Sequence, residues 1–67
     1  MPRKIRELVR DLKKSGWYLD WQKGSHRVFK HPKLAEHVSL LGAGADDAKN
    51  YEEKNVARAI ENARKTK

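Results

Sequence analysis

The spacing of the hydrophobic residues changes twice along the chain, and this change limits the possible folds more than any other feature of the sequence. Near each end of the chain, hydrophobic residues follow the i, i+3, i+4, i+7 spacing of an amphipathic helix. The first stripe consists of Ile5, Leu8, Val9 and Leu12, and the second consists of Val56, Ala59, Ile60 and Ala63. The two stripes predict helices over roughly residues 3–14 and 51–64.

Between the two stripes, hydrophobic and polar residues alternate, which is the period of a β-strand. The alternation predicts strands over residues 17–22, 26–31 and 37–41. Gly24-Ser25 fits a two-residue hairpin turn, because glycine tolerates the positive φ that such a turn needs. Pro32 ends the second strand, and residues 33–36 are predicted to form a connection. Asn50 with Glu53 has the spacing of a capping box at the start of the second helix.

The large aromatic residues have two possible roles. Trp17, Trp21 and Phe29 are all capable of stacking on nucleic-acid bases. A domain this small, however, has few other large apolar side chains to fill its core. Trp17 and Trp21 also share one face of the first predicted strand with Leu19. We therefore expect Trp17 and Trp21 to lie in the core.

A two-residue turn fixes the register of the hairpin by counting. It places Lys23 opposite His26, Gln22 opposite Arg27 and Trp21 opposite Val28. His26 then lies on the same face as Trp21 and Val28, one step from the tip of the hairpin. This register predicts an imidazole at the rim of the core.

The order of the predicted elements is helix, three strands, helix. Two amphipathic helices can cover one face of a three-stranded antiparallel sheet, which gives a two-layer α+β domain with the element order of double-stranded-RNA-binding domains. The 67 residues are expected to form a single domain, residues 1–67. The sequence contains no cysteine and no apolar run long enough for a membrane span or an export signal, so a cytoplasmic location is expected.

The charge is concentrated in the first half of the chain. Residues 1–33 contain ten Lys and Arg residues and three acidic residues, whereas residues 34–67 contain six of each sign. The whole net charge of +7 therefore belongs to the first half. A one-sided positive field attracts polyanions. Nucleic acid is the leading candidate partner, with an anionic membrane surface or an acidic protein as alternatives.

Histidine is the main candidate for acid–base chemistry, because the chain has no cysteine and its carboxylates are scattered. His26 follows the glycine turn, and three basic residues lie near it in the sequence: Lys23, Arg27 and Lys30. A base at this place can remove the proton of an RNA 2′-hydroxyl, which then attacks the adjacent phosphate without a metal. On the residues alone, the simpler interpretation is favoured, in which His26 is a polar residue that fills the end of the hairpin.

Metal binding is not favoured by the sequence. His26 and His31 are an odd number of positions apart in one predicted strand, so their side chains face opposite sides of the sheet. An acidic cluster precedes and begins the second helix and consists of Asp46, Asp47, Glu52 and Glu53. Negative charge is favourable at a helix N-terminus, which explains this cluster better than a metal site does.

Several segments together resemble the HicA toxin family of bacterial type II toxin–antitoxin systems. The matching segments are Arg6-Glu7-Leu8-Val9, Gly16-Trp17, Gln22-Lys23-Gly24-Ser25-His26-Arg27 and Phe29-Lys30-His31-Pro32. The C-terminal part departs from the commoner family pattern, which has a proline-glycine-histidine segment before the last helix. The segment from Leu41 to Lys49, followed by Tyr51, Glu53-Lys54 and Val56, is similar to one HicA subgroup instead.

The resemblance implies an mRNA interferase that acts independently of the ribosome and has a double-stranded-RNA-binding-like fold. It implies that His26 is the catalytic histidine, that no cofactor is needed, and that a HicB-family antitoxin neutralises the toxin by covering this residue. Gly24 is expected to shape the turn that presents His26, and the residues expected to bind RNA are Lys23, Gly24, Ser25, Arg27 and Lys30. Among these, the phosphate contacts of Lys23, Arg27 and Lys30 are our own inference from their positions in the sequence. Two alternatives remain open: an RNA-binding module that does not cleave, and a degenerate toxin that only binds the antitoxin.

Overall fold

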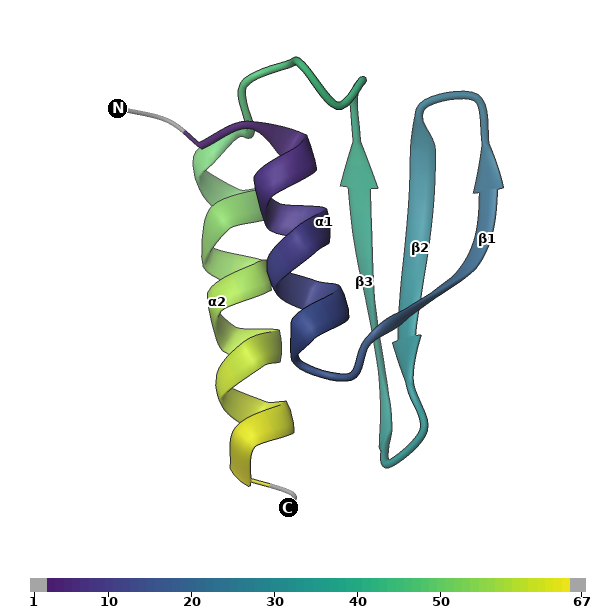
Figure 1. Cartoon of the computed structure of the whole chain (residues 1–67), viewed down its shortest axis with the longest axis vertical. Helices are drawn as coiled ribbons and strands as arrows, with labels where there is room; N and C mark the ends of the chain where they lie inside the picture. Colours follow the sequence, from purple (N-terminus) through teal and green to yellow (C-terminus); the bar gives the residue numbers. More distant parts are fainter. Residues whose placement is uncertain (1–2, 66–67) are drawn as a thin grey trace.

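Two helices and one three-stranded antiparallel sheet make up the fold (Figure 1). The computed structural model describes residues 3–65. The elements, in chain order, are α1 (Ile5–Lys14), β1 (Tyr18–Lys23), β2 (His26–His31), β3 (Leu34–Leu41) and α2 (Asn50–Lys65). The strands lie in the order β1-β2-β3, so β2 is the central strand. None of the helices in this part of the chain is both long and apolar enough to cross a membrane.

Both helices pack against the same face of the sheet, as the sequence predicts. They lie side by side in Figure 1, and both begin at the end of the sheet where β3 ends. Their buried side chains form one cluster with side chains from β2 and β3, and this cluster includes Leu8, Leu12, Phe29, Val38, Leu40, Val56 and Ala59. The two-layer α+β architecture is therefore confirmed. Phe29 is completely buried in the cluster, so its ring is not available to stack on a base.

The opposite face of the sheet is covered by no other element of residues 3–65, and we call it the open face. Because side chains alternate along a strand and paired residues share a face, the register assigns its members. The open face carries Tyr18, Trp21 and Lys23 of β1, His26, Val28 and Lys30 of β2, and His37, Ser39 and Leu41 of β3. This face is the surface on which the hairpin presents its polar side chains.

The third strand begins three residues earlier than the sequence predicts. β3 starts at Leu34, which pairs directly with His31 of β2. Pro32 and Lys33 form a tight turn, so the predicted connection over residues 33–36 is wrong. The turn is short because proline cannot continue β2 and its fixed φ angle suits the first position of a tight turn. The chain therefore pairs with β2 again directly after Lys33.

A bulge at Asp20 overturns the prediction that Trp21 lies in the core. Leu19 pairs with Phe29 and Trp21 pairs with Val28, so Asp20 is an extra residue in β1. An extra residue reverses the alternation of the side chains that follow it. Leu19 therefore faces the helices and Trp21 faces the open side, where 46% of its surface is exposed. Trp17 precedes β1 and is buried as predicted, with 2% of its surface exposed.

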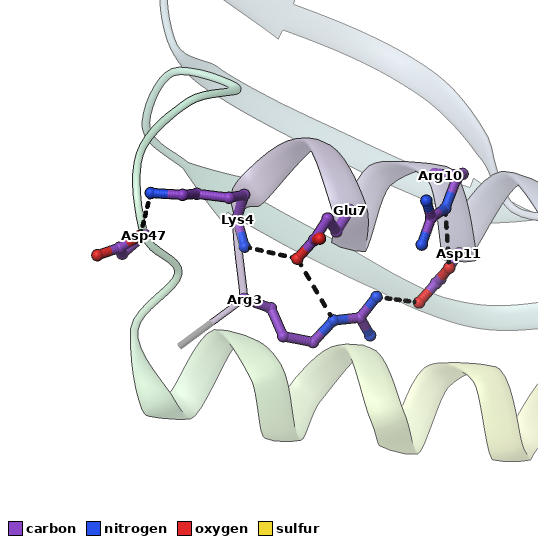
Figure 2. Close-up of polar contacts among 6 residues, drawn as sticks. All are labelled: Arg3, Lys4, Glu7, Arg10, Asp11 and Asp47. Atoms are coloured by element: carbon purple, nitrogen blue, oxygen red, sulfur yellow. Dashed lines mark hydrogen bonds and ion pairs between the residues drawn. The ribbon is translucent and has the colours of Figure 1, made fainter. Parts of the chain in front are cut away.

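A network of charged groups surrounds the start of α1 (Figure 2). The Arg3 guanidinium lies 2.7 Å from Oδ2 of Asp11 and 3.8 Å from Oε1 of Glu7. The Lys4 ammonium lies 2.6 Å from Oδ1 of Asp47, in the loop that precedes α2. Arg10 also contacts Asp11, at 3.4 Å. These contacts pair Arg3 and Lys4, which precede α1, and Arg10 within α1 with acidic groups, and they connect the start of the helix to that loop.

Substitution of Asp11 is expected to give a pH-dependent loss of stability. Partial burial opposes ionisation of Asp11, but the hydrogen bond and charge of Arg3, with help from Arg10, outweigh it and lower the pKa of this carboxyl. A pKa that is lower in the folded state contributes stability above the unfolded value of about 3.9, and this contribution is lost as the pH falls through the folded value. Asp11→Asn should therefore reduce the free energy of unfolding by about 0.5–1 kcal/mol at pH 7.

Urea unfolding of the wild type and of Asp11→Asn, at pH 7 and at the lowest pH at which both are folded, measures this effect. The difference between the two proteins should shrink toward zero at acidic pH. An equal difference at both pH values would show that the carboxylate charge is not the source of the stabilisation.

Candidate active site

The hairpin between β1 and β2 presents His26 on the open face, next to the turn. The predicted register is confirmed, with Lys23 opposite His26 and Trp21 opposite Val28. Gly24 has a φ of +58° at the first turn position, a conformation that strains other residues. The His26 ring is partly exposed and contacts the Trp21 indole in an edge-to-face arrangement, with 5.2 Å between ring centroids. The predicted place at the rim of the core is wrong, because the face that His26 shares with Trp21 is the open one.

The position of the hairpin tip is fixed by hydrogen bonds to the chain that follows β3. The Gly42 N–H donates to the Ser25 carbonyl oxygen, at 3.1 Å. The Arg27 guanidinium donates to the Gly42 carbonyl oxygen, at 3.0 Å. In Figure 1 the hairpin turn, the end of β3 and the first turns of both helices lie at the same end of the molecule. His26 is therefore the first residue of the central strand, directly after a supported turn.

A buried carboxylate connects the second helix to the strand beside His26. Glu52 of α2 has only 1% of its surface exposed, and its carboxylate accepts hydrogen bonds from the backbone N–H groups of Leu41 (2.8 Å) and Lys49 (3.0 Å). Leu41 is the cross-strand partner of His26. Two backbone donors balance the cost of burying the charged group. Glu52 thus fixes the end of β3 against the start of α2.

The predicted capping box of Asn50 and Glu53 is wrong by one residue. Asn50 is already the first residue of α2, so the residue before the helix is Lys49. Glu52 reaches back to the Lys49 N–H, as the third residue of a capping box does. The Lys49 side chain is not a capping acceptor, and for this reason the sequence pattern pointed to the wrong pair.

Two hollows in the surface meet at His26. One lies on the open face and is lined by Asp20, Trp21, Val28, Lys30, His37 and Ser39 in addition to His26. The other runs along the edge of the sheet between β3 and α2, and its lining includes His37, Leu41, Tyr51 and Arg58. An extended ligand can therefore reach His26 from the open face and from the free edge of β3.

The structure brings together some of the predicted RNA-binding residues. Lys23 is the cross-strand partner of His26, so the two side chains leave the sheet on the same face. Lys30 is on this face too, with its ammonium 3.6 Å from Oδ2 of Asp20. Gly24 and Ser25 form the turn itself. Lys23 and Lys30 thus lie on the same face of the sheet as His26, and the turn lies directly before it.

Arg27 is separated from this group. As the neighbour of His26 in β2, it points to the face that the helices cover. There it braces the backbone at Gly42 and lines a hollow between α1 and the sheet, together with Arg6 and Lys13. The predicted contact between Arg27 and a phosphate at His26 is untested. The position of Arg27 on the other face of the sheet does not favour it.

The other two histidines differ in position. His31 is on the helix side of the sheet, where its ring lies edge-on to Trp17 at 5.4 Å and its Nδ1 accepts from the Lys33 N–H at 3.1 Å. His37 is on the open face and lines both hollows. Within residues 3–65, no cluster of three or more His, Asp or Glu side chains is arranged to hold a metal ion.

Comparison with known proteins identifies the family. A family model described as the HicA toxin of bacterial toxin–antitoxin systems matches residues 5–61, which extend from the start of α1 into the last turns of α2. No curated protein and no solved structure matches the chain. Because the family model covers most of the sequence, the chain belongs to the HicA family, the toxins of bacterial toxin–antitoxin systems.

Proposed function

We propose that this toxin is an endoribonuclease that cleaves mRNA without a metal or cofactor, with His26 as its catalytic residue. The observation that carries the proposal is the position of the His26 imidazole, which is partly exposed beside a supported turn, opposite Lys23, where two hollows meet. A buried histidine with no nearby cation would not support this chemistry. The excess of positive charge in the first half of the chain favours a polyanionic substrate.

The reaction that fits this site is an internal transfer within RNA. Neutral His26 removes the proton of a ribose 2′-hydroxyl, and the 2′-oxygen attacks the adjacent phosphorus. The bond from phosphorus to the 5′-oxygen breaks, and this oxygen leaves as an alkoxide that takes a proton from water. The products are a 2′,3′-cyclic phosphate and a 5′-hydroxyl end. Lys23 and Lys30 stabilise the negative charge that gathers on the non-bridging oxygens.

The antitoxin partner follows from the family, and we propose that it is a HicB-family protein that covers His26. A partner with an acidic surface would be attracted by the basic half of the toxin. Because the open face and the edge of β3 both lead to His26, a protein bound at either place would block RNA. The place of action for an mRNA-cleaving toxin is the cytoplasm.

Incubation of the purified protein with end-labelled RNA in the presence of EDTA tests the proposal. We expect shortened products that carry a 2′,3′-cyclic phosphate, and we expect a single 2′-deoxy substitution at a cleavage position to prevent cleavage there. A protein that binds the RNA and never shortens it would be the non-cleaving RNA-binding module. A protein that neither binds nor cleaves RNA, but binds its antitoxin, would be the degenerate toxin.

A further inference from the structure

The exposed indole of Trp21 has no role in the core of this domain. The bulge at Asp20 turns the side chain away from both helices, and 46% of its surface is exposed. Exposure of a large aromatic side chain is unfavourable unless a partner covers it, and tryptophan is enriched among residues that dominate binding. The ring nearest to the indole belongs to His26, at a centroid distance of 5.2 Å.

We propose that Trp21 is the platform on which a base of the RNA substrate stacks, next to the phosphodiester at His26. The inference rests on the proposed function and names the group that holds the substrate. Proteins that bind single-stranded RNA stack unpaired bases on exposed aromatic rings, within a surface whose cations follow the backbone. Trp21 is such a ring, and Lys23 and Lys30 are cations on the same face.

The hollow on the open face supports this placement. Trp21 and His26 line the same hollow, and Val28 and Ser39, which pair with each other, also line it. A base stacked on the indole has its ribose within reach of the adjacent imidazole, because the two rings are in edge-to-face contact. The sugar and phosphate then lie over the hollow, beside Lys30.

Other exposed aromatic residues are in different surroundings. Tyr18 has a similar exposure, 48%, and is on the same strand and face, but it does not line the hollow that contains His26. Tyr51 is on α2, at the hollow along the edge of β3. Tyr18 therefore provides a matched control for Trp21, with similar exposure and a position outside the hollow that contains His26.

A double-mutant cycle between the protein and the RNA tests the inference. The Kd of an uncleavable RNA, with 2′-deoxy substitution at its cleavage site, is measured for the wild type and for Trp21→Ala. The Kd values of both proteins are also measured for RNAs in which one nucleotide beside the cleavage site lacks its base. Trp21→Ala should weaken binding of the intact RNA about 5- to 150-fold, since stacking of a base is worth about 1–3 kcal/mol. For the RNA that lacks the stacked base, Trp21→Ala should cause no further loss of affinity.

Fluorescence gives a second measurement that does not depend on the alanine variant. RNA should quench the tryptophan emission of the wild type and should leave that of Trp21→Phe nearly unchanged, because Trp17 is buried. Trp21→Phe should keep most of the affinity, and Tyr18→Ala should bind as the wild type does. Equal losses of affinity on intact RNA and on every abasic RNA would overturn the inference.

The cycle also separates this inference from the proposed function. A wild type that cleaves RNA, while Trp21→Ala binds and cleaves with unchanged Kd and KM, would overturn the stacking role alone. A wild type that binds no RNA would overturn both.

Discussion

Replacement of His26 by alanine is expected to abolish cleavage of RNA and to leave RNA binding largely unchanged. A positioned general base contributes about 10²–10⁴-fold to the rate, and none of the other histidines can replace it at the hairpin tip. His31 is on the opposite face of the sheet, and His37 is on the neighbouring strand, opposite Lys30 rather than next to the turn. The cations that attract RNA remain in place in the variant. We therefore expect a fall in rate of at least 100-fold, at RNA concentrations that saturate both proteins.

Single-turnover cleavage of labelled RNA measures the rate, and fluorescence anisotropy measures binding. His31→Asn is the matched control, because an amide oxygen can replace Nδ1 as the acceptor of the Lys33 N–H. This variant should cleave at the wild-type rate once thermal unfolding confirms that it is folded. Cleavage by His26→Ala at an unreduced rate would show that His26 takes no part in the reaction. Equal losses of binding and cleavage would show that His26 binds RNA and is not the base.

The parts of the fold that depend on local spacing were predictable from the sequence. The two helices follow from the stripes of hydrophobic residues, and the register of the β1–β2 hairpin follows from the two-residue turn at Gly24-Ser25. Once the register is known, counting residues along the two strands shows that Trp21 and His26 share a face. These features need no information about distant parts of the chain.

The bulge at Asp20 could not be predicted by the same reasoning. A strict alternation from Trp17 to Trp21 looked like a continuous apolar strand face, and no glycine marks the place where the alternation fails. An extra residue in the strand places the side chains on either side of it on opposite faces, where strict alternation predicts the same face. Trp17 is buried against α2, and Trp21, after the bulge, is on the open face.

The composition of the candidate site was predictable only in part. Adjacent residues of a strand point to opposite faces, so the sequence alone places Arg27 on the opposite face from His26. This argues against contact of both side chains with the same phosphate. Glu52 was not recognisable, because its partners are backbone N–H groups of Leu41 and Lys49, which the sequence pattern does not indicate. Proximity in sequence is thus a weaker guide to this site than strand register.

The two tryptophans should differ strongly in their contribution to stability. Trp17 is buried, its indole N–H donates to the Ala59 carbonyl oxygen at 3.3 Å, and it therefore connects the start of β1 to α2. Trp17→Ala removes a large side chain from the core and leaves that carbonyl without its indole donor, so the free energy of unfolding should fall by about 3–5 kcal/mol. Trp21→Ala removes a side chain that is half in water, and the loss should be about 1 kcal/mol or less.

Urea unfolding followed by far-ultraviolet circular dichroism, which does not depend on tryptophan emission, measures the value for Trp21→Ala, and the circular dichroism signal without urea gives the folded fraction of Trp17→Ala. A small domain has little stability to lose, so Trp17→Ala is expected to be largely unfolded without urea. Trp17→Phe keeps an aromatic ring and loses the N–H donor, and its stability should lie between those of the wild type and Trp17→Ala. If Trp21→Ala were the more damaging substitution, the bulge at Asp20 would be wrongly placed and Trp21 would belong to the core. The stacking role of Trp21 would then fail for the same reason, because a ring that fills the core cannot hold a base.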